Sequence, residues 1–209
     1  MDLFIHKIFF SLQGESSLSG FPSVFIRLAG CNLRCAYCDT KEAYEQNHKM
    51  SIVSIIEQVS HYQGSDHLTI TGGEPLWQKN VYLLFEELLK KDYKIQLETN
   101  GSLNLKRVPE VIRKIVDVKT PSSQERDSFL LENLDYLTKN DEIKFVIATK
   151  EDYIFSKNFI KKNLTKTETI INFSPVEQLI DPVKLAKMIL EDKLKVRLNL
   201  QMHKSLGLC

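Results

Sequence analysis

The chain has 209 residues, of which 43% are hydrophobic and 26% charged, and its formal net charge is +1. This length and composition predict one globular domain spanning 1–209, and the near-neutral charge does not favour nucleic acid or a membrane surface as a partner. No apolar run reaches the ~18 residues of a membrane span. The apolar start lacks the features of a secretory signal. We therefore expect a cytoplasmic protein with neither a membrane nor a nucleic-acid partner.

Short β-branched or apolar segments alternate with longer amphipathic ones. The predicted strands are Val24–Leu28, His67–Thr71, Lys94–Glu98, Ile115–Lys119, Glu142–Ile147, Thr169–Phe173 and Val196–Leu200. The predicted helices are Ser51–His61, Gln78–Lys91, Ser123–Leu137, Tyr153–Lys162 and Pro182–Glu191. Ser51 and Asp152 are the expected N-caps, and Pro182 suits a first helical turn.

Strand–helix alternation predicts right-handed βαβ units and a mostly parallel sheet. About six such units are too few for a closed eight-unit barrel, for which ~250 residues are typical. We therefore expect an α/β fold with a curved, incomplete, partial TIM-like barrel.

Unusual residues repeatedly follow the predicted strands, where parallel sheets collect their chemistry. The segments concerned are the loop at Cys31, Gly72-Gly73-Glu74-Pro75, Glu98-Thr99-Asn100-Gly101, Lys119-Thr120-Pro121-Ser122, Ser174-Pro175 and Gln201-Met202-His203. One edge of the sheet is thus predicted to hold almost every candidate residue.

Three of the four cysteines, Cys31, Cys35 and Cys38, fall in one loop, and Cys209 is the last residue. In a reducing compartment, such clustering indicates metal binding or catalysis rather than disulfides. Three thiolates can hold three irons of a cubane and leave the fourth open to a small molecule with an amine and a carboxylate. The alternative is a structural zinc ion, which requires a fourth ligand; His48 and Cys209 do not have typical zinc spacing.

Cys-x3-Cys-x2-Cys after the first strand, with Tyr37 before its last cysteine, resembles the signature of the radical S-adenosylmethionine (SAM) superfamily. Gly72-Gly73-Glu74-Pro75 resembles that superfamily's segment at the SAM amino group, although alone it also fits a plain turn. The resemblance implies a [4Fe–4S] cluster on the three cysteines and SAM as the second cofactor.

Arg27 stands in the otherwise apolar strand Val24–Leu28. A buried guanidinium requires an anion, and its planar fork matches a carboxylate. The anion is either a ligand carboxylate or a partner in a structural ion pair.

The chain is similar over nearly its whole length to the 7-carboxy-7-deazaguanine synthase family of radical SAM enzymes. The resemblance rests on Leu12-Gln13-Gly14-Glu15, Arg27, Cys38-Asp39-Thr40, Glu98-Thr99-Asn100-Gly101, Lys119-Thr120-Pro121-Ser122-Ser123 and Leu200-Gln201-Met202-His203-Lys204. It implies conversion of 6-carboxy-5,6,7,8-tetrahydropterin to 7-carboxy-7-deazaguanine with loss of ammonia, a step toward 7-deazapurines such as the queuosine precursor. The adenosyl radical would abstract hydrogen from C6 of the pterin and later recover it. The family further implies Mg²⁺, an external electron donor of the flavodoxin or ferredoxin type, and a homodimer.

The resemblance also implies site residues. Those expected at the pterin are Leu12, Gln13, Gly14, Glu15, Arg27, Thr71, His203 and the terminal carboxylate of Cys209. Those expected at SAM are Tyr37, Asp39, Gly72, Gly73, Glu74, Glu98, Asn100, Lys119 and Ser122, and Thr40 is expected at Mg²⁺. His203 is the acid–base candidate, or else a satisfied core histidine, and Thr40 could instead cap a short helix. Family chains often end in proline where this one has Cys209, which leaves that side chain without an expected role.

Two other functions remain open. A glycyl-radical-enzyme activase needs an open face for a protein loop and has no use for a carboxylate clamp such as Arg27. A zinc-stabilised nucleic-acid-binding module predicts a fourth zinc ligand and a basic stripe with interleaved aromatics, and the sequence contains neither.

Overall fold

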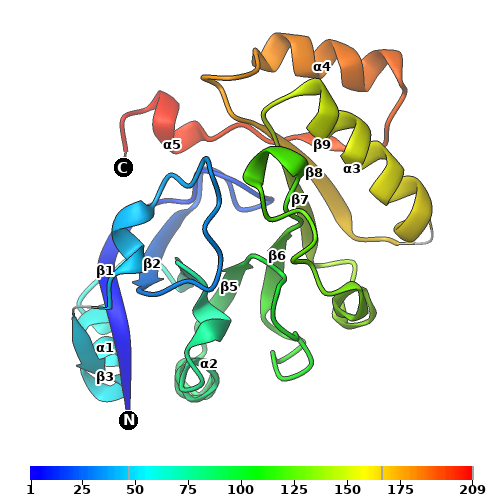
Figure 1. The fold of residues 1–209 in the computed structure, drawn as a ribbon. Coiled ribbons are helices and arrows are strands. Elements are labelled where there is room, and N and C mark those ends of the chain that lie inside the picture. The colour runs from blue at the N-terminus through cyan, green and yellow to red at the C-terminus, as the bar shows by residue number, and fades with distance from the viewer. Residues whose placement is uncertain (47, 166, 209) are drawn as a thin grey trace.

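The computed structural model describes residues 1–209 except 47, 166 and 209, and its centre is one nine-stranded sheet (Figure 1). The strands are β1 Asp2–Leu12, β2 Pro22–Leu28, β3 Lys49–Ser51, β4 His67–Gly72, β5 Lys94–Thr99, β6 Arg113–Asp117, β7 Glu142–Ile147, β8 Ile170–Pro175 and β9 Arg197–Leu198. The α-helices are α1 Ile52–Ser60, α2 Val81–Leu89, α3 Lys150–Asn163, α4 Pro182–Glu191 and α5 Met202–Ser205. Short 3-10 helices are η1 Lys41–Tyr44, η2 Pro75–Trp77, η3 Pro121–Ser123 and η4 Leu131–Tyr136.

The sheet is open and mostly parallel, in the order β3-β1-β2-β4-β5-β6-β7-β8-β9. From β2 to β9 each neighbouring pair is parallel, which confirms the predicted mostly parallel, incomplete barrel. Within the described residues, β3 and β9 are the two edge strands of the sheet. Figure 1 shows α1, α2, α3 and α4 around the outside of the curved sheet.

The amino-terminal segment corrects the sequence prediction. Residues 2–12 were not expected in the sheet, yet β1 pairs antiparallel with both β2 and β3. The apolar start of the chain is therefore an integral strand. It brings Leu12, at its last position, to the start of the loop that contains Gln13, Gly14 and Glu15.

The strands present different side chains on their two faces. Alternate residues such as Ile26, Ile70, Leu97 and Phe145 are fully or almost fully buried in the core under the helices. The residues between them form the opposite face, called the polar face below although Phe25, Ile115 and Val146 also lie on it; its polar members are Ser23, Arg27, Thr69, Thr71, Gln96, Glu98, Asp117, Glu142, Lys144, Asn172 and Ser174. Because side chains alternate along a strand, burying one face in the apolar core leaves a second, independent set of side chains for chemistry.

Of the two predicted N-caps, Ser51 is confirmed and Asp152 is wrong, and the first-turn position of Pro182 is confirmed. Ser51 caps α1 by accepting from Ser54 N at 3.0 Å, and Asp181 caps α4, which begins at Pro182. Helix α3 is capped by Thr149 instead of Asp152. Asp152 is the third helical residue, and its carboxylate accepts from Thr149 N at 2.9 Å, so the two residues form a capping box.

The predicted helix Ser123–Leu137 is also wrong, because this segment contains only η3, η4 and connecting turns. The buried amide of Asn133 donates to Gly101 O and Leu103 O, both at 2.9 Å, and accepts from Leu105 N. These tertiary hydrogen bonds hold the segment against the loop after β5 and override its local helical pattern. Of the last predicted strand, Val196–Leu200, only Arg197–Leu198 form a strand, β9.

No helix among the described residues is long and apolar enough to cross a membrane.

Candidate active site

The loop after β4 lies directly against the segment that leads into the cysteines. Gly73 N donates to Leu28 O at 3.1 Å and Glu74 N to Gly30 O at 2.9 Å. A Cβ atom on Gly73 would lie 2.1 Å from Gly30 O. Gly72 has φ +140°, a conformation that favours glycine. The two glycines are therefore required for this close backbone approach.

Glu74 turns inward from the same loop. Its side chain is fully buried; Oε1 accepts from Leu76 N and from Thr99 Oγ1, and Oε2 accepts from Asn100 N at 2.7 Å. Burial raises the pKa of Glu74 although these hydrogen bonds oppose the shift. Asn100 in turn places its Nδ2 3.9 Å from the Cys31 sulfur. Glu74 thus positions Asn100 beside the first cysteine.

The cysteine loop, residues 30–40, holds three free and partly exposed thiols. Burial raises the pKa of Cys35 to about 11, and the charges of the other two cysteines add to the shift. Tyr37 OH lies 3.2 Å from Thr120 Oγ1, and Ala36 N donates to Ser123 O at 3.0 Å. The cysteine loop is therefore fixed against the loop after β6.

Lys119 and Ser122, both expected at SAM, belong to that loop after β6. Lys119 Nζ donates to Asp117 Oδ2 at 3.0 Å, and its side chain is 13% exposed. Ser122 N donates to Asp152 Oδ1 at 2.8 Å, and its hydroxyl lies 3.3 Å from Thr149 Oγ1. Ser122 therefore contacts the start of α3.

Glu15 is the centre of the polar face. Its carboxylate accepts from Lys144 Nζ at 3.1 Å, Asn199 Nδ2 at 3.3 Å and Gln201 Nε2 at 2.6 Å. Burial opposes ionisation, but Lys144 and Gln201 outweigh it and hold the pKa of Glu15 below its ordinary value. Likewise, burial would lower the pKa of Lys144, but the carboxylates of Glu15, Asp117 and Glu98 raise it. This is a compensated buried ion pair.

Gln13 links Glu15 to β4 and β5. Its Nε2 donates to Glu98 Oε1 at 3.1 Å and to Thr69 Oγ1 at 3.2 Å, while its Oε1 accepts from Glu15 N. Glu98, expected beside SAM, is therefore grouped with Gln13 and Glu15 on the polar face. No hydrogen bond joins it to the cysteine loop in the described part of the chain.

Arg27 lies on the polar face of β2, opposite Thr71 of β4 in the parallel register. Its Nη1 donates to Thr40 Oγ1 at 2.9 Å, and its Cζ lies 5.8 Å from the centroid of the Phe9 ring. Among the described residues no carboxylate pairs with Arg27, so the structural ion pair considered from the sequence does not form. The guanidinium can still accept an anion.

Thr40 joins Arg27 to Asp39, because its hydroxyl also donates to Asp39 Oδ1 at 3.1 Å. Thr40 stands at the N-cap of η1, but its side chain makes no capping hydrogen bond there. Asp39 Oδ2 accepts from Lys204 Nζ at 3.3 Å, which ties the cysteine loop to the carboxy-terminal segment.

The carboxy-terminal segment packs on Gly14. Met202 N donates to Gly14 O at 3.0 Å, and a Cβ atom on Gly14 would lie 1.9 Å from His203 Nδ1. His203 is partly exposed and near enough to Glu15 to lower the pKa of that carboxyl. It is not the satisfied core histidine considered from the sequence. The expected role of Cys209 lies outside the described residues.

Comparison with known proteins agrees with this geometry. Residues 25–153 match the model of the Radical SAM superfamily. The 7-carboxy-7-deazaguanine synthase of Koribacter versatilis is 44% identical over 96% of this chain and 95% of that protein. The protein of the same name from Methanospirillum hungatei is 40% identical over 98% and 85%. This chain belongs to the 7-carboxy-7-deazaguanine synthase family of the radical SAM superfamily. The crystal structure of QueE from Escherichia coli shares the fold at 24% identity, with 97% and 95% coverage and a TM-score of 0.81.

Membership of the 7-carboxy-7-deazaguanine synthase family implies a [4Fe–4S] cluster and SAM. The chemistry of the donor set fits, because one loop carries three free, partly exposed thiols, of which Cys31 lies beside Gly73 and Asn100. Among the described residues, no group of three or more His, Cys, Asp or Glu side chains is arranged as a site for a single metal ion.

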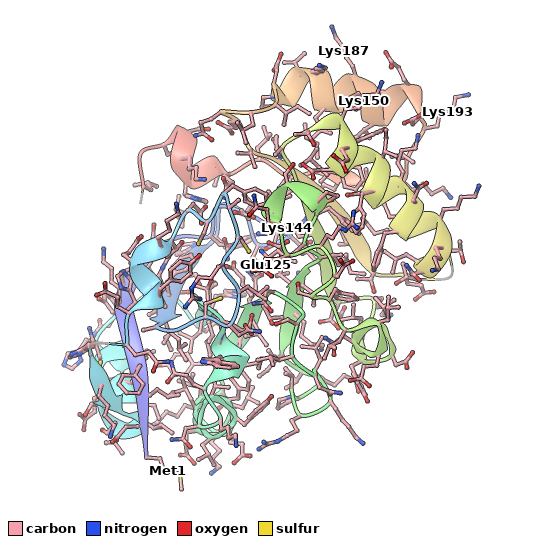
Figure 2. The ribbon with its side chains drawn as sticks, viewed as in Figure 1. Met1, Glu125, Lys144, Lys150, Lys187 and Lys193 are labelled. Atoms are coloured by element: carbon pink, nitrogen blue, oxygen red, sulfur yellow. The ribbon has the colours of Figure 1, made fainter. Side chains whose placement is uncertain are left out.

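Sequence reasoning missed two charged residues of this radical SAM site, Asp117 and Lys144. They lie on neighbouring strands, and Figure 2 labels Lys144 near the middle of the view, whereas Lys187 and Lys193 project outward. A signal was present, since Lys144 and Asp117 interrupt strands whose alternate residues are apolar. Charged residues that share one face of a buried strand, Arg113 with Asp117 and Glu142 with Lys144, indicate that this face is largely polar.

Proposed function

We propose that this protein converts 6-carboxy-5,6,7,8-tetrahydropterin to 7-carboxy-7-deazaguanine with loss of ammonia. The observation that supports the substrate best is Arg27, a guanidinium without a carboxylate partner among the described residues. It stands beside the cysteine loop, to which Thr40 connects it. A substrate carboxylate is the anion that its planar fork would accept.

The bound cluster and SAM supply the 5′-deoxyadenosyl radical. The residues of the polar face orient the substrate toward it. Arg27 holds the carboxylate, and Thr71, next to Arg27 in the β2–β4 register, contacts the same end of the molecule. Holding the reacting carbon in one orientation is the main contribution that such contacts make to rate.

The far end of the pterin is bound by the loop after β1. Glu15 is kept ionised by Lys144 and so can accept from a pterin N–H group with its remaining lone pair. Leu12, Gln13, Gly14 and Glu98 line the same region, partly through backbone groups. His203 is held over Gly14, where its ring nitrogen can give or take a proton from the substrate.

SAM is bound on the cysteine-loop side. We assign direct contacts to Tyr37, Asp39, Gly72, Gly73, Asn100, Lys119 and Ser122. Glu74 acts through Asn100, because its carboxylate is fully buried and already accepts three hydrogen bonds.

Several finer assignments belong to the same proposal. Mg²⁺ would bind at Thr40, where Asp39 supplies a second oxygen and a carboxylate held by Arg27 could supply a third. We also propose a single domain over 1–209, a homodimer in the cytoplasm, and an electron donor of the flavodoxin or ferredoxin type.

The decisive experiment gives anaerobically reconstituted protein a reductant, SAM, Mg²⁺ and 6-carboxytetrahydropterin, and follows products by mass spectrometry. We expect 7-carboxy-7-deazaguanine without stoichiometric 5′-deoxyadenosine. Abortive 5′-deoxyadenosine alone would refute the substrate and leave the activase next in line.

Arg27→Ala tests the carboxylate clamp separately. Arg27 is half-buried, and the bound pterin would cover it, so losing this charge pair should weaken pterin binding by about 2–5 kcal/mol. The iron content should stay that of the unmodified protein. Unchanged pterin affinity in a calorimetric titration would remove Arg27 from the site.

A further inference from the structure

Asp117 ends β6 between the two halves of the site. Its Oδ2 accepts from Lys119 Nζ at 3.0 Å and lies 3.9 Å from Lys144 Nζ. Lys144 leads on to Glu15, on the side assigned to the pterin. Toward the cysteine loop, Asp117 leads into the loop after β6, where Thr120 Oγ1 lies 3.2 Å from Tyr37 OH and Ser123 O accepts from Ala36 N at 3.0 Å. The carboxylate thus lies where the cofactor and the substrate have to meet.

The second oxygen of this carboxylate, Oδ1, is buried and has no hydrogen-bond partner. Only two other buried side-chain atoms of the described residues share this condition, His67 Nδ1 and Ser128 Oγ, and neither belongs to a carboxylate. Buried polar atoms in native proteins are almost always hydrogen-bonded, and leaving a charged one unpaired is costly. The two lysines hold Oδ2, so Oδ1 is left as an acceptor in a fixed position.

We propose that Asp117 is a further ligand-binding residue of this site, whose Oδ1 accepts a hydrogen bond from an N–H or O–H group of bound SAM or of the pterin. This inference rests on the proposed function for the identity of the pterin. Both molecules carry donors of this kind: SAM has ribose hydroxyl and amino groups, and the reduced pterin has ring N–H groups. Lys144 acts as a positioning residue, and Lys119, besides its own proposed contact with SAM, orients the same carboxylate.

Asp117→Asn is the sharpest test. The amide keeps the shape of the side chain, and its single carbonyl oxygen will face the lysines. Its NH₂ group then occupies the place of Oδ1 and opposes the donor of the ligand. Loss of a hydrogen bond to a charged acceptor should weaken binding of that ligand about 10- to 100-fold.

A matched control is Asp141→Asn. Asp141 is also a buried aspartate paired with a lysine, Lys114, at 3.1 Å, but it lies at the opposite end of the same two strands. This variant should be less stable yet bind every ligand with unchanged affinity. Asp117→Ser replaces Asp117→Asn if circular dichroism or iron content shows that the asparagine variant does not assemble.

Calorimetry on the anaerobically reconstituted full chain should compare SAM, S-adenosylhomocysteine and 6-carboxytetrahydropterin. An equal loss of affinity for SAM and S-adenosylhomocysteine supports a donor on the cofactor, and a loss confined to the pterin supports a donor on the substrate. A loss for SAM alone reflects attraction to its sulfonium charge and overturns the hydrogen bond. Affinities within about twofold of the unmodified protein also overturn it.

The two SAM-type ligands keep the test independent of the proposed reaction. If the unmodified protein fails to bind or convert the pterin, the proposed function fails. The titrations with SAM and S-adenosylhomocysteine then decide by themselves whether Asp117 binds a ligand.

Discussion

Glu74→Gln tests whether the acidic residue of Gly72-Gly73-Glu74-Pro75 acts on SAM directly or through Asn100. The two carboxylate oxygens have different partners. Oε1 accepts from Leu76 N at 3.0 Å and from Thr99 Oγ1 at 2.8 Å, which the carbonyl of glutamine can also do. Oε2 accepts from Asn100 N at 2.7 Å, where glutamine would present an NH₂ group to another N–H.

The expected cost follows from this geometry. One hydrogen bond to a charged acceptor, worth about 1.5–3 kcal/mol, is lost, and the backbone N–H of Asn100 is left buried without a partner. The substitution also removes a carboxylate that burial disfavours, as its raised pKa indicates. We therefore expect the free energy of unfolding to fall by about 1–2 kcal/mol at neutral pH, and Asn100 to move relative to Cys31.

Urea unfolding of the cluster-free protein measures the first effect, and calorimetry with SAM on the reconstituted protein measures the second. Asn100→Ala and the double variant complete a mutant cycle. If Glu74 acts through Asn100, the losses of SAM affinity are not additive, and the coupling should be about 0.5–3 kcal/mol. Unchanged unfolding together with additive losses would refute this reasoning and return Glu74 to direct contact with SAM.

Three further substitutions test other parts of the site. Cys35→Ala should abolish both the brown cluster absorbance and SAM cleavage, and an intact cluster spectrum would remove Cys35 from the ligands. Gly14→Ala puts a methyl group 1.9 Å from His203 Nδ1, so pterin affinity should fall about tenfold or more while iron content is unchanged; equal affinity would contradict the packing of His203. The lowered pKa of Glu15 means that its ionised form stabilises the fold above the ordinary value of 4.5. The stability advantage over Glu15→Gln should therefore shrink as pH falls through the lowered pKa, and a constant difference in urea titrations would argue against the Lys144 pair.

Much of the fold follows from periodicity, because the six parallel strands β2 and β4 to β8 and the helices α1, α2 and α4 each bury apolar residues at regular spacing. Strand β1 was not predicted because no tight turn joins it to β2. The loop between the two strands instead forms part of the site through Gln13 and Glu15. The segment around Asn133 was wrongly predicted as a helix because the carbonyls that accept from its buried amide are distant in the sequence. Local propensity depends on neighbouring residues in the sequence, so it predicts neither the pairing of β1 nor the distant partners of Asn133.

The site divides in the same way. Cysteine spacing and the Gly72-Gly73 pair could be recognised from the sequence, since each is a local arrangement of a few residues. The grouping of Glu98 with Gln13 could not, because it depends on which strands are neighbours and on where the loop after β1 folds back. The roles of Asp117 and Lys144 could not be predicted for the same reason, because the partners of Lys144 lie on a neighbouring strand and in the loop after β1.

The polar face explains why a binding site can be this highly charged inside a folded protein. Glu15 is matched by Lys144 and Asp117 by Lys119, so these buried charges are compensated before any ligand arrives. Arg27 and Asp117 Oδ1 are the exceptions among the described groups, one a cation without a carboxylate and the other an anionic oxygen without a donor. Preorganised groups of this kind need no rearrangement when the complementary charge or donor arrives. A ligand with a carboxylate at Arg27 and a hydrogen-bond donor at Asp117, beside Lys119 and Lys144, satisfies both groups. We therefore expect both residues to govern ligand affinity more than stability.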